Sequence, residues 1–205
     1  MNRCSVAVLS LLMCACAATP PYRADVPDDP ELAAAIDREA EPEAIAVCHG
    51  YGCLKSEFLS IDRDAWREIA GLFQPGAPGA DEERNRVARA VAIFERSMGR
   101  QVGTDGDKPR TPFSLGDPTQ LDCVDESINT SSFLHLLERK KLLRWHRVGE
   151  PAQRYAVWFF GIHFTAVLVD RQTGVAWAVD SWFHENGMPA EVVELDRWKS
   201  GWEPE

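Results

Sequence analysis

Hydrophobic residues recur with helical spacing in two stretches of the first half of the chain. One stretch predicts a helix over residues 64–73, and the other predicts a helix over residues 81–98. The apolar face consists of Trp66, Ile69, Ala70 and Phe73 in the first helix and of Val87, Ala90, Val91 and Phe94 in the second. A Pro/Gly cluster separates the two helices, and the Gly- and Pro-rich segment 99–118 predicts a long irregular connection after the second.

A third helix is predicted to begin at Cys123, within the stretch from Gln120 to Thr130. Asp122 is suited to the N-cap position, and Asp125, three positions later, completes a capping box. The following turns carry apolar residues around most of the helix circumference, as expected of a helix that its domain encloses. We expect this helix to end near residues 143–144.

Beta-branched and aromatic residues dominate two long stretches in the C-terminal part, Tyr155–Val169 and Val175–Phe183. The turn sequence between them predicts a hairpin. A further strand is predicted over Ala190–Leu195, and Trp198 and Trp202 after it are expected to cover the core. Helices first and an antiparallel sheet second predict an α+β fold.

The chain has 205 residues and a formal net charge of −10. This length suits one domain with a proper core. The acidic balance argues against nucleic acid as a partner and against electrostatic docking to an anionic membrane. We find no internal repeat, and the short apolar run at the N-terminus is too short to span a bilayer.

Residues 1–16 resemble a bacterial lipoprotein signal, with a positive charge followed by a short apolar run. Ala15 precedes Cys16 as in a lipobox, whereas Cys14 fits less well because Met13 would occupy the small-residue position. The resemblance implies a lipid on Cys16 and a place on the periplasmic side of the outer membrane. Secretion to the periplasm without lipid is the alternative.

The segment after the signal, residues 17–45, is rich in Pro, Ala, Asp and Glu and predicts a flexible tether. Residues 46–205 then form the single folded domain. Within it, Cys48 and Cys53 are close enough in sequence to bridge each other in an oxidising compartment. A metal site made by these two cysteines and His49 is the competing interpretation.

Cys123 remains as the unpaired thiol and is the candidate nucleophile. At the first position of a helix, the free N–H groups and the helix dipole favour a thiolate. The alternative is that Cys123 is a small buried hydrophobic residue, as most free cysteines are.

A thiol nucleophile needs a base, and the base needs an orienting group. His163 and Asp180 lie in the two strands of the predicted hairpin. If Asp170 pairs with Val175, Thr165 faces Asp180, and His163 lies one diagonal step away on the same face. A turn one residue longer would place His163 and Asp180 on opposite faces.

The other histidines are weaker candidates for the base. His184 lies near Asp180 and is the second choice, His135 is expected in the enclosed helix, His146 follows that helix, and His49 lies beside the expected disulfide. Trp177 and Trp182 flank Asp180, where one could form the wall of a substrate cleft.

A helix-borne cysteine, then a strand histidine, then an aspartate in a Val-Asp-Ser-Trp context resembles the transglutaminase-like branch of the papain-fold cysteine enzymes. More narrowly, Asp122-Cys123-Val-Asp-Glu126, His163 before Ala-Val, and Asp180 are similar to the bacterial transglutaminase-like cysteine proteinases. The resemblance covers residues 81–183. Val124 stands where that family usually has an acidic residue.

The resemblance implies a periplasmic cysteine hydrolase that cleaves a peptide or amide bond of a protein substrate in the cell envelope through a thioester. Cys123 would attack the carbonyl, His163 would move the proton and Asp180 would hold the imidazole. The oxyanion would be bound by the Cys123 N–H and the Gln120 side chain. Some relatives use calcium, and Asp122, Asp125 and Glu126 are the carboxylates that could bind it.

Two other functions are compatible with the sequence. A non-catalytic envelope lipoprotein could keep the same fold as a binding scaffold, with Cys123 buried and inert. Hydrolysis of peptidoglycan cross-links is suggested by the expected location alone. The exposure and the pKa of Cys123 distinguish a nucleophile from a core thiol.

Overall fold

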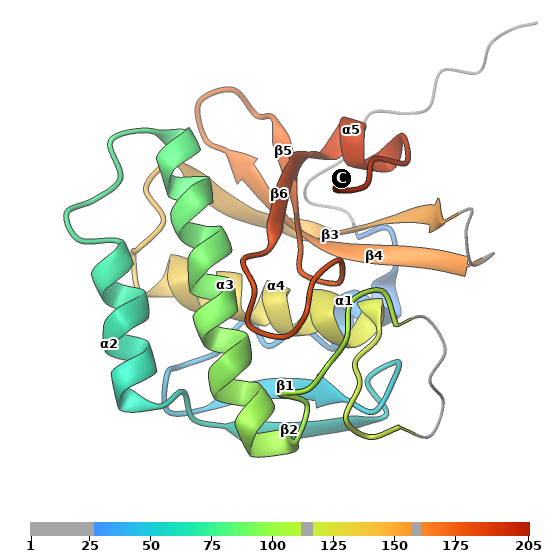
Figure 1. Cartoon of the computed structure of the whole chain (residues 1–205). Helices are drawn as coiled ribbons and strands as arrows, with labels where there is room; N and C mark the ends of the chain where they lie inside the picture. Colours follow the sequence, from blue (N-terminus) through green and yellow to red (C-terminus); the bar gives the residue numbers. More distant parts are fainter. Residues whose placement is uncertain (1–26, 112–116, 157–160) are drawn as a thin grey trace, which may run out of the picture.

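A computed structural model describes residues 27–111, 117–156 and 161–205 of the chain (Figure 1). The described helices are α1 (Pro30–Ala34), α2 (Arg63–Leu72), α3 (Ala80–Val102), α4 (Cys123–Arg139) and α5 (Leu195–Lys199). The described strands are β1 (Ile45–His49), β2 (Lys55–Leu59), β3 (His146–Ala156), β4 (Gly161–Asp170), β5 (Ala176–Asp180) and β6 (Glu191–Glu194). The predicted α+β class is confirmed.

The larger sheet has four antiparallel strands in the order β3-β4-β5-β6, and β1 and β2 form a separate antiparallel pair. Helix α4 lies between the two sheets, with α5 on the far side of the larger one (Figure 1). The main core lies on the α4 face, where Phe94 of α3 stacks on Phe133 of α4 with ring centroids 4.5 Å apart. The smaller core on the other face of the sheet centres on Trp198, which is fully buried as expected.

The hairpin between β4 and β5 has the predicted register. The N–H of Asp170 donates to the carbonyl of Val175, and Ala166 pairs with Val179. The next position along the two strands therefore places Thr165 opposite Asp180. The Asp170 side chain accepts N–H bonds from the turn residues Gln172 and Thr173, which fixes the turn.

The predicted long strand Tyr155–Val169 is wrong, because the chain forms two strands there. Tyr155 lies in β3 and His163 lies in β4, and these two strands pair antiparallel. Residues 157–160 of the predicted strand lie outside the described residues. The continuous apolar stretch predicts one strand and gives no sign of the turn within it. The first part of β3 was not predicted because Gly149 and Pro151 are unfavourable in strands. A β-bulge between Gly149 and Ala152 accommodates them.

The hairpin β1-β2 was not expected, since the sequence around the two cysteines predicts only a tight loop. The disulfide between Cys48 and Cys53 is present, which confirms the pairing and leaves neither sulfur as a metal ligand. It closes a hairpin loop in which four consecutive residues, Gly50 to Cys53, have positive φ. Such a loop needs outside support because Tyr51 and Cys53 rarely adopt this conformation.

Two predicted helix ends differ from the structure. Helix α4 ends at Arg139 rather than near residues 143–144, because Lys141 takes a left-handed conformation with φ of 58°. No Gly or Asn signals this stop. Helix α3 continues through Gly99 to Val102. Gly99 serves close packing there, since a Cβ on it would lie 3.0 Å from the backbone N of Asp105.

The segment 27–45, expected as part of a flexible tether, is packed onto the domain instead. Asp29 caps α1, and apolar side chains of the segment, including Leu32, Ile36 and Ala40, are buried. Arg38 forms an ion pair with Glu150 of β3 at 2.8 Å. The acidic composition concealed these regularly placed apolar residues. No helix in the described part of the chain is long and apolar enough to cross a membrane.

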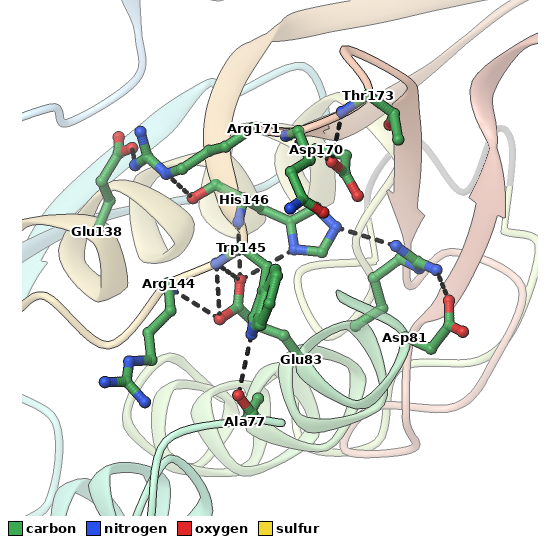
Figure 2. Close-up of polar contacts among 12 residues, drawn as sticks. Ala77, Asp81, Glu83, Glu138, Arg144, Trp145, His146, Asp170, Arg171 and Thr173 are labelled. Atoms are coloured by element: carbon green, nitrogen blue, oxygen red, sulfur yellow. Dashed lines mark hydrogen bonds and ion pairs between the residues drawn. The ribbon is translucent and has the colours of Figure 1, made fainter. Parts of the chain in front are cut away.

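A buried polar network joins the start of α3 to the start of β3 (Figure 2). The Glu83 carboxylate accepts backbone N–H bonds from Arg144, Trp145 and His146 and a further bond from Nδ1 of His146 at 2.9 Å. Burial alone would raise the pKa of Glu83, but these donors lower it on balance. An ionised Glu83 therefore connects the helical part of the chain to the sheet.

Replacing Glu83 with Ala should lower the free energy of unfolding by about 3 kcal/mol, because it leaves several buried donors unpaired. Urea unfolding measures the change. Glu82→Ala is the matched control, since Glu82 lies one position away and forms a partly exposed ion pair with Arg86. Equal effects of the two substitutions would show that the network does not hold the domain together.

Candidate active site

Cys123 is the first residue of α4, and the predicted capping box is present. The Asp122 carboxylate accepts N–H bonds from Val124 and Asp125, both at 3.0 Å, and the Asp125 carboxylate accepts the Asp122 N–H at 3.4 Å. These bonds satisfy free N–H groups at the helix start and fix the direction in which α4 begins. The position of the thiol is therefore set by the helix and not by a loop.

Helix α4 also holds the disulfide loop. The Asp125 carboxylate accepts the N–H groups of Tyr51 at 2.9 Å and Cys53 at 2.8 Å. One turn later, the Asn129 amide bonds both the N–H and the carbonyl of Cys48, at 2.6 and 2.9 Å. The disulfide loop is thus held beside Cys123 through the backbone of its residues.

The predicted pairing of His163 and Asp180 is present. Nε2 of His163 lies 2.7 Å from Oδ2 of Asp180, and both side chains are buried. The indole N–H of Trp198 donates to the same oxygen at 2.7 Å, and the Trp182 N–H lies 3.3 Å from the other oxygen. The Asp180 carboxylate therefore lies within hydrogen-bonding distance of three groups.

This bonding determines the tautomer of His163. Because Asp180 acts as an acceptor, Nε2 of His163 carries the hydrogen, and Nδ1 of the neutral ring carries the lone pair. Aromatic rings enclose the imidazole, with centroids at 4.6 Å for Trp182, 5.4 Å for Trp198 and 5.6 Å for Phe183. The aspartate and these rings leave the imidazole little freedom to turn.

Cys123 contacts the backbone on both sides of His163. Its thiol donates to the carbonyl of Ile162, with Sγ 3.7 Å from the oxygen, and accepts the N–H of Phe164. Strand β5 pairs with β4 only over residues 166–169, so this edge of β4 lies beyond the end of β5. The thiol therefore lies at the edge of β4 at the level of His163.

Cys123 and His163 reach this position from opposite faces of the sheet. Ala166 and Leu168 of β4 face α4, whereas Val167 and Val169 face Trp198. By alternation, His163 shares the face of Trp198. Of the two ring nitrogens, Nδ1 is the one nearer the backbone of His163.

Cys123 is a neutral thiol in this structure. The pKa of the Cys123 thiol is raised to about 12, chiefly by burial. The nearby carboxylates Asp122, Asp180 and Glu126 also raise it, whereas the N–H of Phe164 lowers it. The thiolate expected at a helix start is therefore not favoured here. Cys123 is only 8 % exposed, so its burial and its raised pKa both match the alternative of a core thiol and not the partly exposed, low-pKa thiol expected of a nucleophile.

The three carboxylates of the expected calcium set are directed to different partners. Asp122 caps α4, Asp125 holds the disulfide loop, and Glu126 points into a buried acidic cluster. In the described part of the chain, no group of three His, Cys, Asp or Glu side chains has metal-binding geometry.

The acidic cluster contains Glu126 of α4, Glu95 of α3 and Asp107 of the loop after α3. The Ser181 hydroxyl donates to Glu126 at 3.2 Å, and Glu126 is hydrogen-bonded to Asp107. Burial raises the pKa of Glu95 to about 7 and that of Asp107 to about 6, and it raises the pKa of Glu126 well above its usual value. The three groups therefore share protons near neutral pH.

The Gln120 side chain, expected at the oxyanion, holds the preceding loop. Its oxygen accepts the Lys108 N–H at 3.0 Å, and its nitrogen donates to the Gly106 carbonyl at 3.1 Å. Its amide is therefore engaged with the backbone before α4.

Each of the other histidines is hydrogen-bonded to an acidic or basic side chain. The partners are Glu57 for His49, Arg38 for His135, Glu83 for His146 and Glu191 for His184. His184, the second choice as base, is 2.8 Å from Glu191.

Sequence reasoning missed the role of Trp198 and of the backbone of Ile162 and Phe164. Trp198 was expected only to cover the core, and nothing in the sequence shows that its indole reaches Asp180. Backbone groups carry no residue-type signal at all.

Comparison with models of known protein families gives no match, and comparisons with curated proteins and with solved structures give none either. The function is therefore argued from the geometry of the site.

Because thiolate is the reactive form, iodoacetamide should modify folded Cys123 very slowly. At pH 7.5, a pKa raised from 9.0 to about 12 lowers the thiolate fraction roughly a thousandfold. Mass spectrometry of the peptide that carries Cys123 measures the rate, with the urea-unfolded chain as control. Equal rates in the folded and unfolded chain would contradict the raised pKa.

The acidic cluster should make the protein more stable at pH 5 than at pH 8. Raised pKa values mean that the folded chain binds more protons than the unfolded chain between about pH 4 and 7, so stability falls as the pH rises through this range. Glu126→Gln should raise the melting temperature at pH 8 by about 2–4 °C, as about 1 kcal/mol does in a chain of this length. Replacement of the exposed Glu185 with Gln should leave the melting temperature unchanged. A lower melting temperature in both variants would contradict the role of the cluster.

Proposed function

We propose that this protein is a cysteine hydrolase of the transglutaminase-like papain fold that cleaves a peptide or amide bond with Cys123, His163 and Asp180. The observation that carries the proposal is the hydrogen bond between Asp180 and His163, in which Nε2 carries the hydrogen and Nδ1 can act as the base. The Cys123 thiol is hydrogen-bonded to the backbone of the residues before and after His163. A histidine that only stabilises the fold needs no aspartate at Nε2 and no thiol hydrogen-bonded to its neighbouring backbone.

In the first step, Sγ of Cys123 bonds to the substrate carbonyl carbon while its proton passes to Nδ1 of His163. Because burial favours the neutral thiol, proton transfer accompanies bond formation instead of preceding it. Asp180 stabilises the imidazolium that results. The C–N bond then breaks, the leaving amine takes the proton from Nδ1, and a thioester remains on Cys123.

In the second step, water replaces the amine. Nδ1 of His163 takes a proton from water as its oxygen bonds to the thioester carbon, and the C–S bond breaks with the proton returning to sulfur. The carboxylic acid leaves and the thiol is restored. The backbone N–H of Cys123, which has no partner within α4 because it lies in the first turn, would bind the oxyanion.

A lipid on Cys16, a residue outside the described part of the chain, and a periplasmic location belong to the same proposal. A disulfide at Cys48 and Cys53 supports an oxidising compartment. The substrate would then be a protein or peptide of the cell envelope.

A non-catalytic scaffold is the second candidate, and the burial of Cys123 with its raised pKa favours it. In that case the pairing of His163, Asp180 and Trp198 only fastens α5 to the sheet. The two functions differ in whether the reaction of Cys123 depends on His163.

The deciding experiment measures covalent labelling of Cys123 by peptidyl vinyl sulfones at pH 7. His163→Ala should slow labelling about a hundredfold, the usual contribution of a general base. Asp180→Asn should slow it similarly, because an amide N–H donated to Nε2 would force the hydrogen onto Nδ1. The difference between wild type and His163→Ala should shrink as the pH approaches 12, because a thiol with a pKa raised to about 12 then ionises without a base.

His184→Ala is the control for this prediction, since His184 is also paired with a carboxylate but contacts Glu191 instead. It should label at the wild-type rate. Labelling that ignores His163, or no labelling of any chain, would support the scaffold.

A further inference from the structure

A cavity of about 290 Å³ opens directly beside the candidate active site. It lies between α1, the disulfide loop and the start of α4. Two of its lining residues are chain neighbours of the proposed catalytic residues, since Val124 follows Cys123 and Phe164 follows His163. Phe164 also donates its N–H to the thiol. A group bound here would therefore contact Phe164, whose backbone N–H bonds the thiol of Cys123.

The floor of the cavity is apolar and its rim is acidic. Leu32, Val124 and Phe164 supply the apolar surface, and Asp29 and Glu31 supply two carboxylates. Asp29 is held in place as the cap of α1, and Glu31 is exposed. Among the described residues that line the cavity, none is basic.

Exposed apolar side chains continue this surface along the sheet. Tyr155 of β3 is 85 % exposed and Ile162 of β4 is 43 % exposed, and the two are paired across the strands. By alternation, Ile162 lies on the same face of β4 as Phe164. Large apolar groups left exposed near the proposed nucleophile suit the binding of an extended chain.

We infer that this cavity binds a lysine or arginine side chain of the substrate next to the bond that is cleaved. The apolar floor fits the aliphatic stem of such a side chain, and the acidic rim fits its cationic end. An apolar side chain would leave the rim without a counter-charge, and an acidic one would be repelled. This inference rests on the proposed hydrolase function.

The test uses the full-length protein and tripeptidyl vinyl sulfones that carry Lys, Leu or Glu at one position and Ala elsewhere. The second-order rate of Cys123 modification is measured by mass spectrometry. At the position that reaches the cavity, the Lys probe should react about tenfold faster than the Glu probe. The reason is that Asp29 and Glu31 attract the charge of the Lys probe and repel the charge of the Glu probe. The preference should weaken at 1 M salt.

Glu31→Lys should remove or reverse the preference for Lys, measured as the ratio of the rate with the Lys probe to the rate with the Glu probe. The matched control is Asp64→Lys, because Asp64 is an exposed acid of α2, on a different part of the fold (Figure 1). Both variants change the net charge equally, so a general charge effect would appear in both.

The outcomes separate the two proposals. Equal rates for Lys and Glu probes, with labelling that still depends on His163, would overturn the basic subsite and leave the hydrolase standing. Labelling of Cys123 by no probe would overturn both. An equal loss of Lys preference in Glu31→Lys and Asp64→Lys would show that the overall charge of the protein, and not this cavity, selects the probe.

Discussion

The structure depends on the enclosure of α4, a helix that brings many polar side chains into the interior. Its buried polar residues include Asp125, Asn129 and Ser132. A buried polar group without a partner costs free energy. These three side chains bond to the backbone of other segments, at Tyr51 and Cys53, at Cys48, and at Asp37, whose N–H donates to Ser132 at 2.9 Å. These bonds fold the N-terminal third of the chain around the helix that carries Cys123.

The site that results is rich in acidic groups. Asp122, Asp125, Glu126 and Asp180 all lie close to the thiol or to the start of α4, and Asp107 lies behind them. So many carboxylates disfavour a thiolate. The raised pKa values of Asp125 and Glu126 keep these two groups partly protonated, which reduces the repulsion between the negative charges. A cationic substrate group would relieve the remaining charge.

The relation between Cys123 and His163 follows from where β5 ends. If β5 paired along the whole of β4, it would occupy the Ile162 carbonyl and the Phe164 N–H, and the thiol could not dock there. Because the chain turns away after Asp180, this edge is open to α4 from one face, while the carboxylate of Asp180 holds the imidazole on the other. Trp198 then closes the site from α5 by donating to the same carboxylate. One strand end thus exposes the docking edge and supplies the orienting group.

The sequence by itself determined the elements whose signals are local. The capping residues around Cys123, the spacing of Cys48 and Cys53 and the turn at Asp170 depend on a few neighbouring residues, and all three were predicted correctly. The turn register in turn placed His163 and Asp180 on one face, since alternation along paired strands is fixed. Only the tertiary structure decided the split of the long apolar run into β3 and β4, the packing of α1, the burial of Cys123 and the bond from Trp198 to Asp180. These depend on contacts between residues far apart in the chain, for which residue type and spacing carry no signal. The pKa of Cys123 shows the difference most clearly, because the helix start favours a thiolate locally, whereas burial by distant segments favours the thiol.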